Sequence, residues 1–196
     1  MAQLFLSQMY AEHASIAAVL NAMSALVREV RQRGKRIDPK AFRAMLYYLD
    51  VFPEREHHRK EEFVLFPRIR ARTHAIDKVL AELAREHEAG EKAIRRLEQA
   101  FLRYEERGDA EFATFAAAAD EYVARYYEHM RKEERDVMPL ALRVLTAEDW
   151  VAIEAEFAQH QDPLAGATVE TNPDELFRRI VMLVPAPYGV GAPIDE

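Results

Sequence analysis

The sequence predicts an all-α protein: an antiparallel up-down four-helix bundle followed by additional short C-terminal helices. Three observations support this fold class. Glycine accounts for only 6 of the 196 residues, about half the usual share of roughly 7%, whereas an all-β sandwich or barrel needs glycine at its many turns. Glycine and proline are concentrated at a few points, which leaves long uninterrupted segments. Within these segments, apolar residues recur in steps of three and four, the spacing of a buried helical face.

Turn and capping residues divide the first three quarters of the chain into four helices of roughly 30 residues each, or about 45 Å. Gly34 ends the first helix, and the pair 38–39, Asp-Pro, supplies an N-cap and a first-turn proline for the second. Thr73 separates the second helix from the third, and the pair 108–109, Gly-Asp, separates the third from the fourth. Pro53 is expected to kink the second helix.

Polar residues interrupt the apolar face of each helix. The face of the first helix includes His13, and that of the third includes His87. The second and fourth helices each carry a histidine and, four residues later, a glutamate, which lie on one helical face about one turn apart. These pairs are His57 with Glu61 and His129 with Glu133. Each of the four histidines lies 19 to 21 residues from the turn at one end of its helix, so an up-down bundle would bring them into one layer.

This layer is predicted to bind metal. A buried carboxylate needs a cation or a proton to offset its desolvation, and the chain has no cysteine, which excludes thiolate sites. If both glutamates bridge, each of two ions would have two histidines and two carboxylate oxygens, with room left for a bridging oxygen or a small ligand. The predicted ligands are His13, His57, Glu61, His87, His129 and Glu133.

Three alternatives remain open at this stage. His58 and Glu62 form a second pair with the same spacing one position along the chain, so the register of the second helix is not fixed. Glu91, one turn after the histidine of the third helix, is either an additional ligand or a solvated charge. Tyr10 and Tyr126 each lie one turn before a candidate ligand, and they either line the site or fill the core.

The motifs resemble those of the hemerythrin-like HHE cation-binding family. The resemblance covers residues 5–142 and rests on AEHASI, HHRKEEFVLFP, REHEAGE and EHMRKEERDVMP, in which the pattern H-x-x-x-E-E-x-x-x-x-P occurs twice. It implies a four-helix bundle with a non-haem di-iron centre and the same six ligands, with Glu61 and Glu133 as bridges. The implied cofactor is two iron ions joined by an oxo or hydroxo bridge, with manganese as the alternative metal.

Departures from the oxygen-carrying hemerythrins narrow the expected function. Those proteins have a second histidine where this chain has Glu91, and an aspartate where it has Glu134, so reversible oxygen transport is not expected. The ligand set is more similar to that of bacterial proteins associated with repair of damaged iron-sulfur centres, but the cysteine-containing segment common in them is missing here. We therefore expect a di-iron protein that binds or reacts with O2, peroxide or nitric oxide. The alternatives are an iron-holding or iron- and oxygen-sensing module without catalysis, and iron-sulfur repair.

Composition restricts the partners and the location. The formal net charge of -7 argues against a nucleic-acid partner. No stretch of about 18 uncharged apolar residues occurs, and no basic segment precedes the first apolar residues, so we expect no membrane partner and a cytoplasmic location.

The prolines beyond residue 160 mark a change in organisation. We predict a hemerythrin-like bundle over 1–145 and a C-terminal helical extension with an irregular tail, packed on the bundle, over 146–196. One helix is expected from Thr146 and another from the pair 172–173, Asn-Pro. Trp150 and Ile153 belong to an apolar stripe that is expected to pack on the bundle. The alternative is a homodimer or protein-partner contact through these helices.

Overall fold

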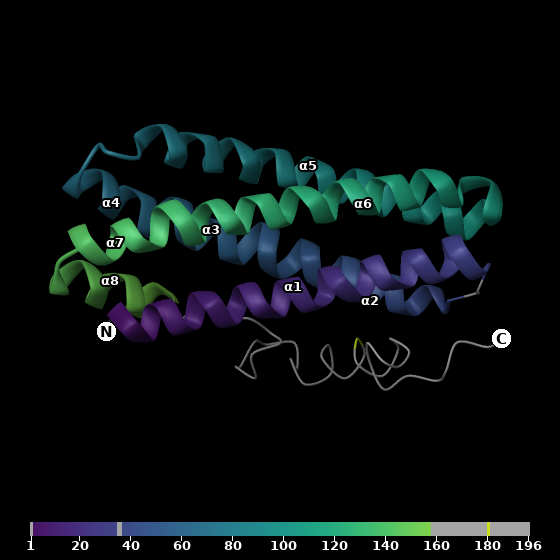
Figure 1. Ribbon diagram of the computed structural model, residues 1–196, viewed down its shortest axis with the longest axis horizontal. Coiled ribbons are helices and arrows are strands. Elements are labelled where there is room, and N and C mark those ends of the chain that lie inside the picture. The colour runs from purple at the N-terminus through teal and green to yellow at the C-terminus, as the bar shows by residue number, and fades with distance from the viewer. Residues whose placement is uncertain (1, 35–36, 158–179, 181–196) are drawn as a thin grey trace.

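The computed structural model describes residues 2–34, 37–157 and 180. Four long helical rods lie side by side and alternate in direction (Figure 1), which confirms the all-α, hemerythrin-like bundle. The rods and the helix that follows them are α1 (Ala2–Arg33); a second rod formed by α2 (Pro39–Leu49), η1 (Asp50–His57), α3 (His58–Lys60), η2 (Glu61–Leu65) and α4 (Phe66–Arg72); α5 (Asp77–Arg107); a fourth rod formed by α6 (Asp109–Lys132), η3 (Glu133–Val137) and α7 (Met138–Val144); and α8 (Ala147–Phe157).

The predicted turn residues separate the rods. Gly34 and Gly108 adopt φ values of 63° and 66°, a left-handed conformation that glycine reaches without steric cost. Asp38 caps α2 because its side chain accepts a hydrogen bond from the backbone N–H of Lys40 at 2.9 Å. The helix expected near residue 172 lies outside the described residues. None of the described helices is both long enough and apolar enough to span a membrane.

The second and fourth rods contain wide π-helical turns beside the predicted ligands. The N–H of Phe66 donates to the carbonyl of Glu61, and the N–H of Met138 donates to that of Glu133, so each bond spans five residues rather than four. A proline follows each donor directly, and its ring cannot donate the next α-helical hydrogen bond. The repeated spacing of glutamate and proline therefore positions a wide turn at each glutamate.

The core consists of two apolar clusters with a polar layer between them. One cluster joins Phe42, Phe52, Phe101 and Phe115 with the aliphatic residues that surround them. The other lies at the opposite end of the bundle and includes Phe66 on the second rod. The predicted ligands lie between these clusters and form the polar layer that separates one cluster from the other.

The short helix α8 packs its apolar residues against the start of α1. The ring centroids of Trp150 and Phe5 lie 5.2 Å apart, and Ile153 is fully buried in the same cluster. This contact extends the second cluster beyond the four rods.

We expect Trp150→Ala to lower the free energy of unfolding by about 3 kcal/mol, because truncating a buried aromatic side chain leaves a cavity. Urea unfolding followed by circular dichroism measures the change. Val151→Ala is the matched control, since Val151 on the same helix is 54% exposed; it should change stability by less than about 0.5 kcal/mol. Equal effects of the two substitutions would contradict the packing role of Trp150.

Candidate metal centre

The structure brings all six predicted ligand residues together in the middle of the bundle. Each rod contributes, and none of the six side chains belongs to a residue more than 6% exposed. The donor atoms of these six residues form two groups that share both glutamates, and His58 forms a third candidate group with His87 and His129. The first donor group is His13, His57, Glu61 and Glu133, and the second donor group is Glu61, His87, His129 and Glu133.

The two glutamates each present one oxygen to each donor group. In the first group, Glu133 Oε2 lies 3.3 Å from His13 Nε2, and Glu61 Oε1 lies 3.6 Å from His57 Nε2. In the second group, the partners are the other two oxygens: Glu133 Oε1 is 3.0 Å from His129 Nε2, and Glu61 Oε2 is 3.5 Å from His87 Nε2. This is the arrangement expected of two carboxylates that bridge two ions.

Unpartnered atoms at the centre test whether a cation fits. Among the described residues, the Nε2 atoms of His13 and His57, Glu61 Oε2 and both Glu133 oxygens are buried without a hydrogen-bond partner. Each such atom costs about 1–3 kcal/mol unless something satisfies it. Two ligand atoms bound to one ion at about 2.1 Å lie roughly 3.0–3.5 Å apart, which is close to the separations above. The donor set therefore suits two cations.

Four further carboxylates hold the histidines in orientation. Each accepts from, or is paired with, the Nδ1 atom of a histidine on the next rod, so Nε2 of every histidine is turned toward the centre. These contacts run from each rod to the next and close around the bundle. The outer carboxylates and their distances are Glu12 to His57 at 2.7 Å, Glu62 to His87 at 2.7 Å, Glu86 to His129 at 3.0 Å and Glu134 to His13 at 2.8 Å.

Two lysines neutralise the outer carboxylates that are least exposed. Lys60 Nζ donates to both oxygens of Glu12, at 3.0 and 3.2 Å, and Lys132 donates to Glu86. Burial alone raises the pKa of Glu12, but hydrogen bonds and charges of His57 and Lys60 outweigh it and lower the pKa to about 2. The pKa of Glu86 is also about 2, chiefly because it is hydrogen-bonded to the imidazole of His129.

Without a cation, the pKa values of the two central carboxyl groups are shifted in opposite directions. Burial and the nearby charge of Glu133 raise the pKa of Glu61 well above its usual value. Burial also acts on Glu133, but three surrounding histidines, with His129 foremost, lower its pKa. Two like charges this close cannot both ionise unaided, so a cation is the natural partner of the pair.

The structure shows where the residues of the open alternatives lie. Glu61 is central and Glu62 is an outer carboxylate, yet both His57 and His58 are buried, because the wide turns bring neighbouring residues to the interior. Glu91 is exposed, as a solvated charge. Tyr10 is 46% exposed, whereas Tyr126 is buried beside His58.

Sequence reasoning missed the outer carboxylates and the two lysines. A signal was present: the motif H-x-R-K-E-E occurs at 57–62 and again at 129–134, and E-H occurs at 12–13 and 86–87. Glu12, which precedes His13, pairs with both His57 and Lys60. In the same way Glu86, which precedes His87, pairs with both His129 and Lys132. The two halves of the polar layer are therefore built from the same types of residue.

Comparison with known proteins gives one match. The family model described as Hemerythrin HHE cation binding domain matches residues 4–141. No curated protein and no solved structure matches the chain.

The lowered pKa of Glu12 predicts an acid-sensitive contribution to the stability of the metal-free protein. Since the folded pKa of about 2 lies below the ordinary 4.5, the contribution is complete above pH 4.5 and is lost as the pH falls toward 2. It amounts to roughly 3 kcal/mol. Urea unfolding at pH 5, 4 and 3 should show a flatter pH dependence for Glu12→Gln than for the parent. Glu148→Gln, at an exposed site on α8, should leave the slope unchanged, and an unchanged slope for Glu12→Gln would contradict the assignment.

Proposed function

The chain belongs to the hemerythrin HHE cation-binding domain family, and we propose that it binds two iron ions, one in each donor group, and reacts with a small oxidant. The observation that carries this proposal is the sharing of Glu61 and Glu133, each of which presents one oxygen to both donor groups. Imidazole and carboxylate ligands suit iron, with manganese as the alternative. Such ions, when bound, would supply the electrons that reduce O2, peroxide or nitric oxide.

The residues of the chain prepare the centre for this role. Two imidazoles and two carboxylate oxygens would leave coordination positions open at each ion for a small ligand. The outer carboxylates fix the tautomer and the direction of the histidines before any ion binds. The apolar clusters on either side restrict water, which strengthens every electrostatic interaction within the layer.

The remaining sequence expectations extend the proposal. We propose that the bundle over 1–145 is the metal-binding unit and that 146–196 is an extension, which agrees with the end of the family match at 141 and with the packing of Trp150 on Phe5. A dimer or protein partner at the C-terminal helices, a cytoplasmic location and the lack of a nucleic-acid partner stay predictions.

Metal analysis tests the proposed ligands. Protein loaded anaerobically with Fe²⁺ and then desalted should retain two iron ions per chain. His13→Ala and His87→Ala each remove a ligand from a different donor group, so each should retain about one ion, whereas Glu133→Ala should impair both sites. His74→Ala is the matched control because His74 is exposed in the loop before α5. Retention of two ions by all the variants would contradict the assignment, as would a value near zero for the parent.

Optical spectroscopy tests reaction with an oxidant. The ferrous protein should gain an absorption band in the near-ultraviolet or visible range when peroxide or nitric oxide is added without O2, or when O2 alone is admitted, and at least one of the three should be consumed. His87→Ala should reduce the rate of that consumption by 10-fold or more, since an ion that lacks a ligand is held less firmly. If two ions bind but none of the three reagents changes the spectrum, a metal-holding role replaces the reactive one.

A further inference from the structure

Two lysines lie inside the polar layer, where burying an ammonium group is costly. Lys60 is 3% exposed, and its Nζ atom donates to the two oxygens of Glu12 at 3.0 and 3.2 Å. Lys132 is 8% exposed and donates to Glu86 and Glu82. A charged lysine has no lone pair with which to bind an ion. Both lysines therefore serve the layer in some way other than as ligands.

The lysines occupy equivalent positions of the internal repeat. Each is the fourth residue of H-x-R-K-E-E and directly precedes a central glutamate. Lys60 contacts the outer carboxylate that pairs with His57, and Lys132 contacts the one that pairs with His129. Since His57 belongs to the first donor group and His129 to the second, each group has one ligand histidine that is backed by a carboxylate and a lysine in series.

Solvent exposure explains which outer carboxylates are paired with a lysine. The side chains of Glu62 and Glu134 are 32% and 39% exposed, so water solvates them. The side chain of Glu12 is only 1% exposed, and that of Glu86 is 29% exposed. Because charges inside a protein are screened much less than charges in water, the buried pair of Lys60 and Glu12 acts on the centre most strongly.

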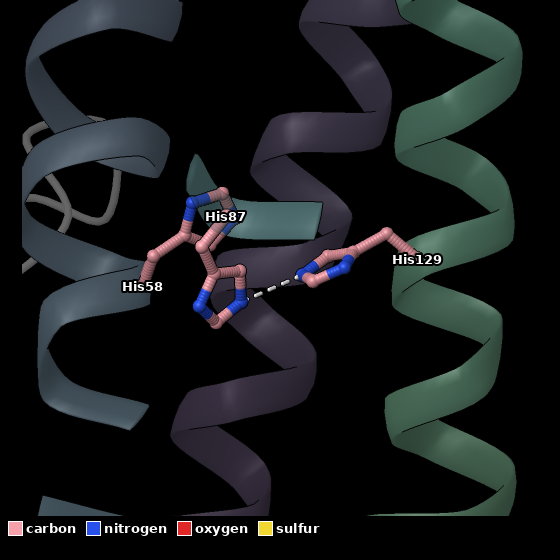
Figure 2. Close-up of side chains that lie close together, drawn as sticks. All are labelled: His58, His87 and His129. Atoms are coloured by element: carbon pink, nitrogen blue, oxygen red, sulfur yellow. Dashed lines mark hydrogen bonds between the residues drawn. The ribbon is translucent and has the colours of Figure 1, made fainter. Parts of the chain in front are cut away.

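The formal charge of the layer matches two divalent ions. A histidine that binds a metal ion is neutral. Figure 2 shows two such imidazoles, His87 and His129, whose Nε2 atoms are 3.1 Å apart; the adjacent His58 is also neutral, because burial lowers its pKa well below the ordinary value. Two central and four outer carboxylates carry six negative charges and the two lysines carry two positive charges, which leaves a net charge of -4. Two divalent ions balance this charge, whereas two trivalent ions exceed it unless they also bind anions.

This balance affects how easily bound ions are oxidised. Loss of one electron from each of two divalent ions, to the oxidant of the proposed function, adds two positive charges to a layer that lies between apolar clusters. Charges interact strongly in such surroundings. A nearby positive charge opposes the oxidation and a nearby negative charge favours it. The two ammonium groups therefore make the ions harder to oxidise than the six carboxylates alone would.

We propose that Lys60 and Lys132 are positioning residues that set the charge of the layer to fit two divalent ions and thereby raise the reduction potential of the ion pair. They act through Glu12 and Glu86, each of which contacts a ligand histidine as well as a lysine. The inference rests on the proposed function, because it requires two bound iron ions, and it specifies the oxidation state that the protein favours before an oxidant arrives.

Substitutions in the buried pair test the inference in iron-loaded protein. Lys60→Met removes the positive charge, and Glu12→Gln removes the negative charge but keeps a carbonyl oxygen that can accept from His57. The double variant, Glu12→Gln with Lys60→Met, has the net charge of the parent, and Lys60→Arg keeps the positive charge. Lys92→Met is the matched control, because Lys92 pairs with Glu88 on the surface of α5 and its side chain is 66% exposed.

The midpoint potential is titrated anaerobically at pH 8 with redox mediators, after the iron content of each variant has been measured. Lys60→Met should favour the ferric state by about tenfold, which lowers the potential by about 59 mV for a one-electron step. Glu12→Gln should shift the potential in the opposite direction by a similar amount. The double variant, Lys60→Arg and Lys92→Met should each stay within about threefold of the parent.

A merely structural role for the pair predicts another pattern, because the double variant loses the same ion pair as the single variants. The inference is overturned if the double variant departs from the parent as far as Lys60→Met does, or if Lys60→Met leaves the potential unchanged or raises it. If Lys60→Met does not fold or retains less iron, Lys132→Met decides. Its shift should be smaller and in the same direction, since the side chain of Lys132 is 10% exposed and also contacts the exposed Glu82; no shift overturns the inference. A parent that retains no iron refutes the proposed function itself.

Discussion

The burial of two carboxylates in the middle of an apolar bundle is the constraint on which the rest of the structure depends. Glu61 and Glu133 are 1% and 0% exposed and lie between two clusters of apolar side chains. A charge in such a place is tolerated only when opposite charge and hydrogen bonds surround it. The histidines and the outer carboxylates meet this requirement.

The polar layer consists of successive shells of residues around its centre. Carboxylate oxygens and imidazole nitrogens face one another at the centre, outer carboxylates hold the far side of every imidazole, and Lys60 and Lys132 neutralise two of those carboxylates. Each contact of an outer carboxylate joins two rods. The four rods are therefore held at one level by polar contacts as well as by apolar packing, which keeps the ligand atoms close to ion-binding separations.

The repeat within the chain makes the polar layer nearly symmetric, with one departure. Both copies of H-x-R-K-E-E supply a histidine, a lysine, a central glutamate and an outer glutamate to the layer. Only one copy adds His58, with Glu54 one turn earlier. Tyr122 and Tyr126 of α6 form hydrogen bonds with Glu54 and His58, respectively, rather than with the central residues. The two donor groups therefore have different surroundings, because the ring of His58 stacks on that of His87 beside the second group.

The sequence by itself determined the four helices, their ends and the six residues that converge at mid-bundle. These features depend on local chemistry: apolar periodicity, glycine at left-handed turns, and histidine and glutamate one helical turn apart. Only the tertiary structure decided which outer carboxylate holds which histidine, that His58 is buried together with His57, and that Glu91 is exposed. The physical reason is that these outcomes depend on the distance between the rods and on how one rod is placed against the next, which the spacing of residues within a single helix does not encode.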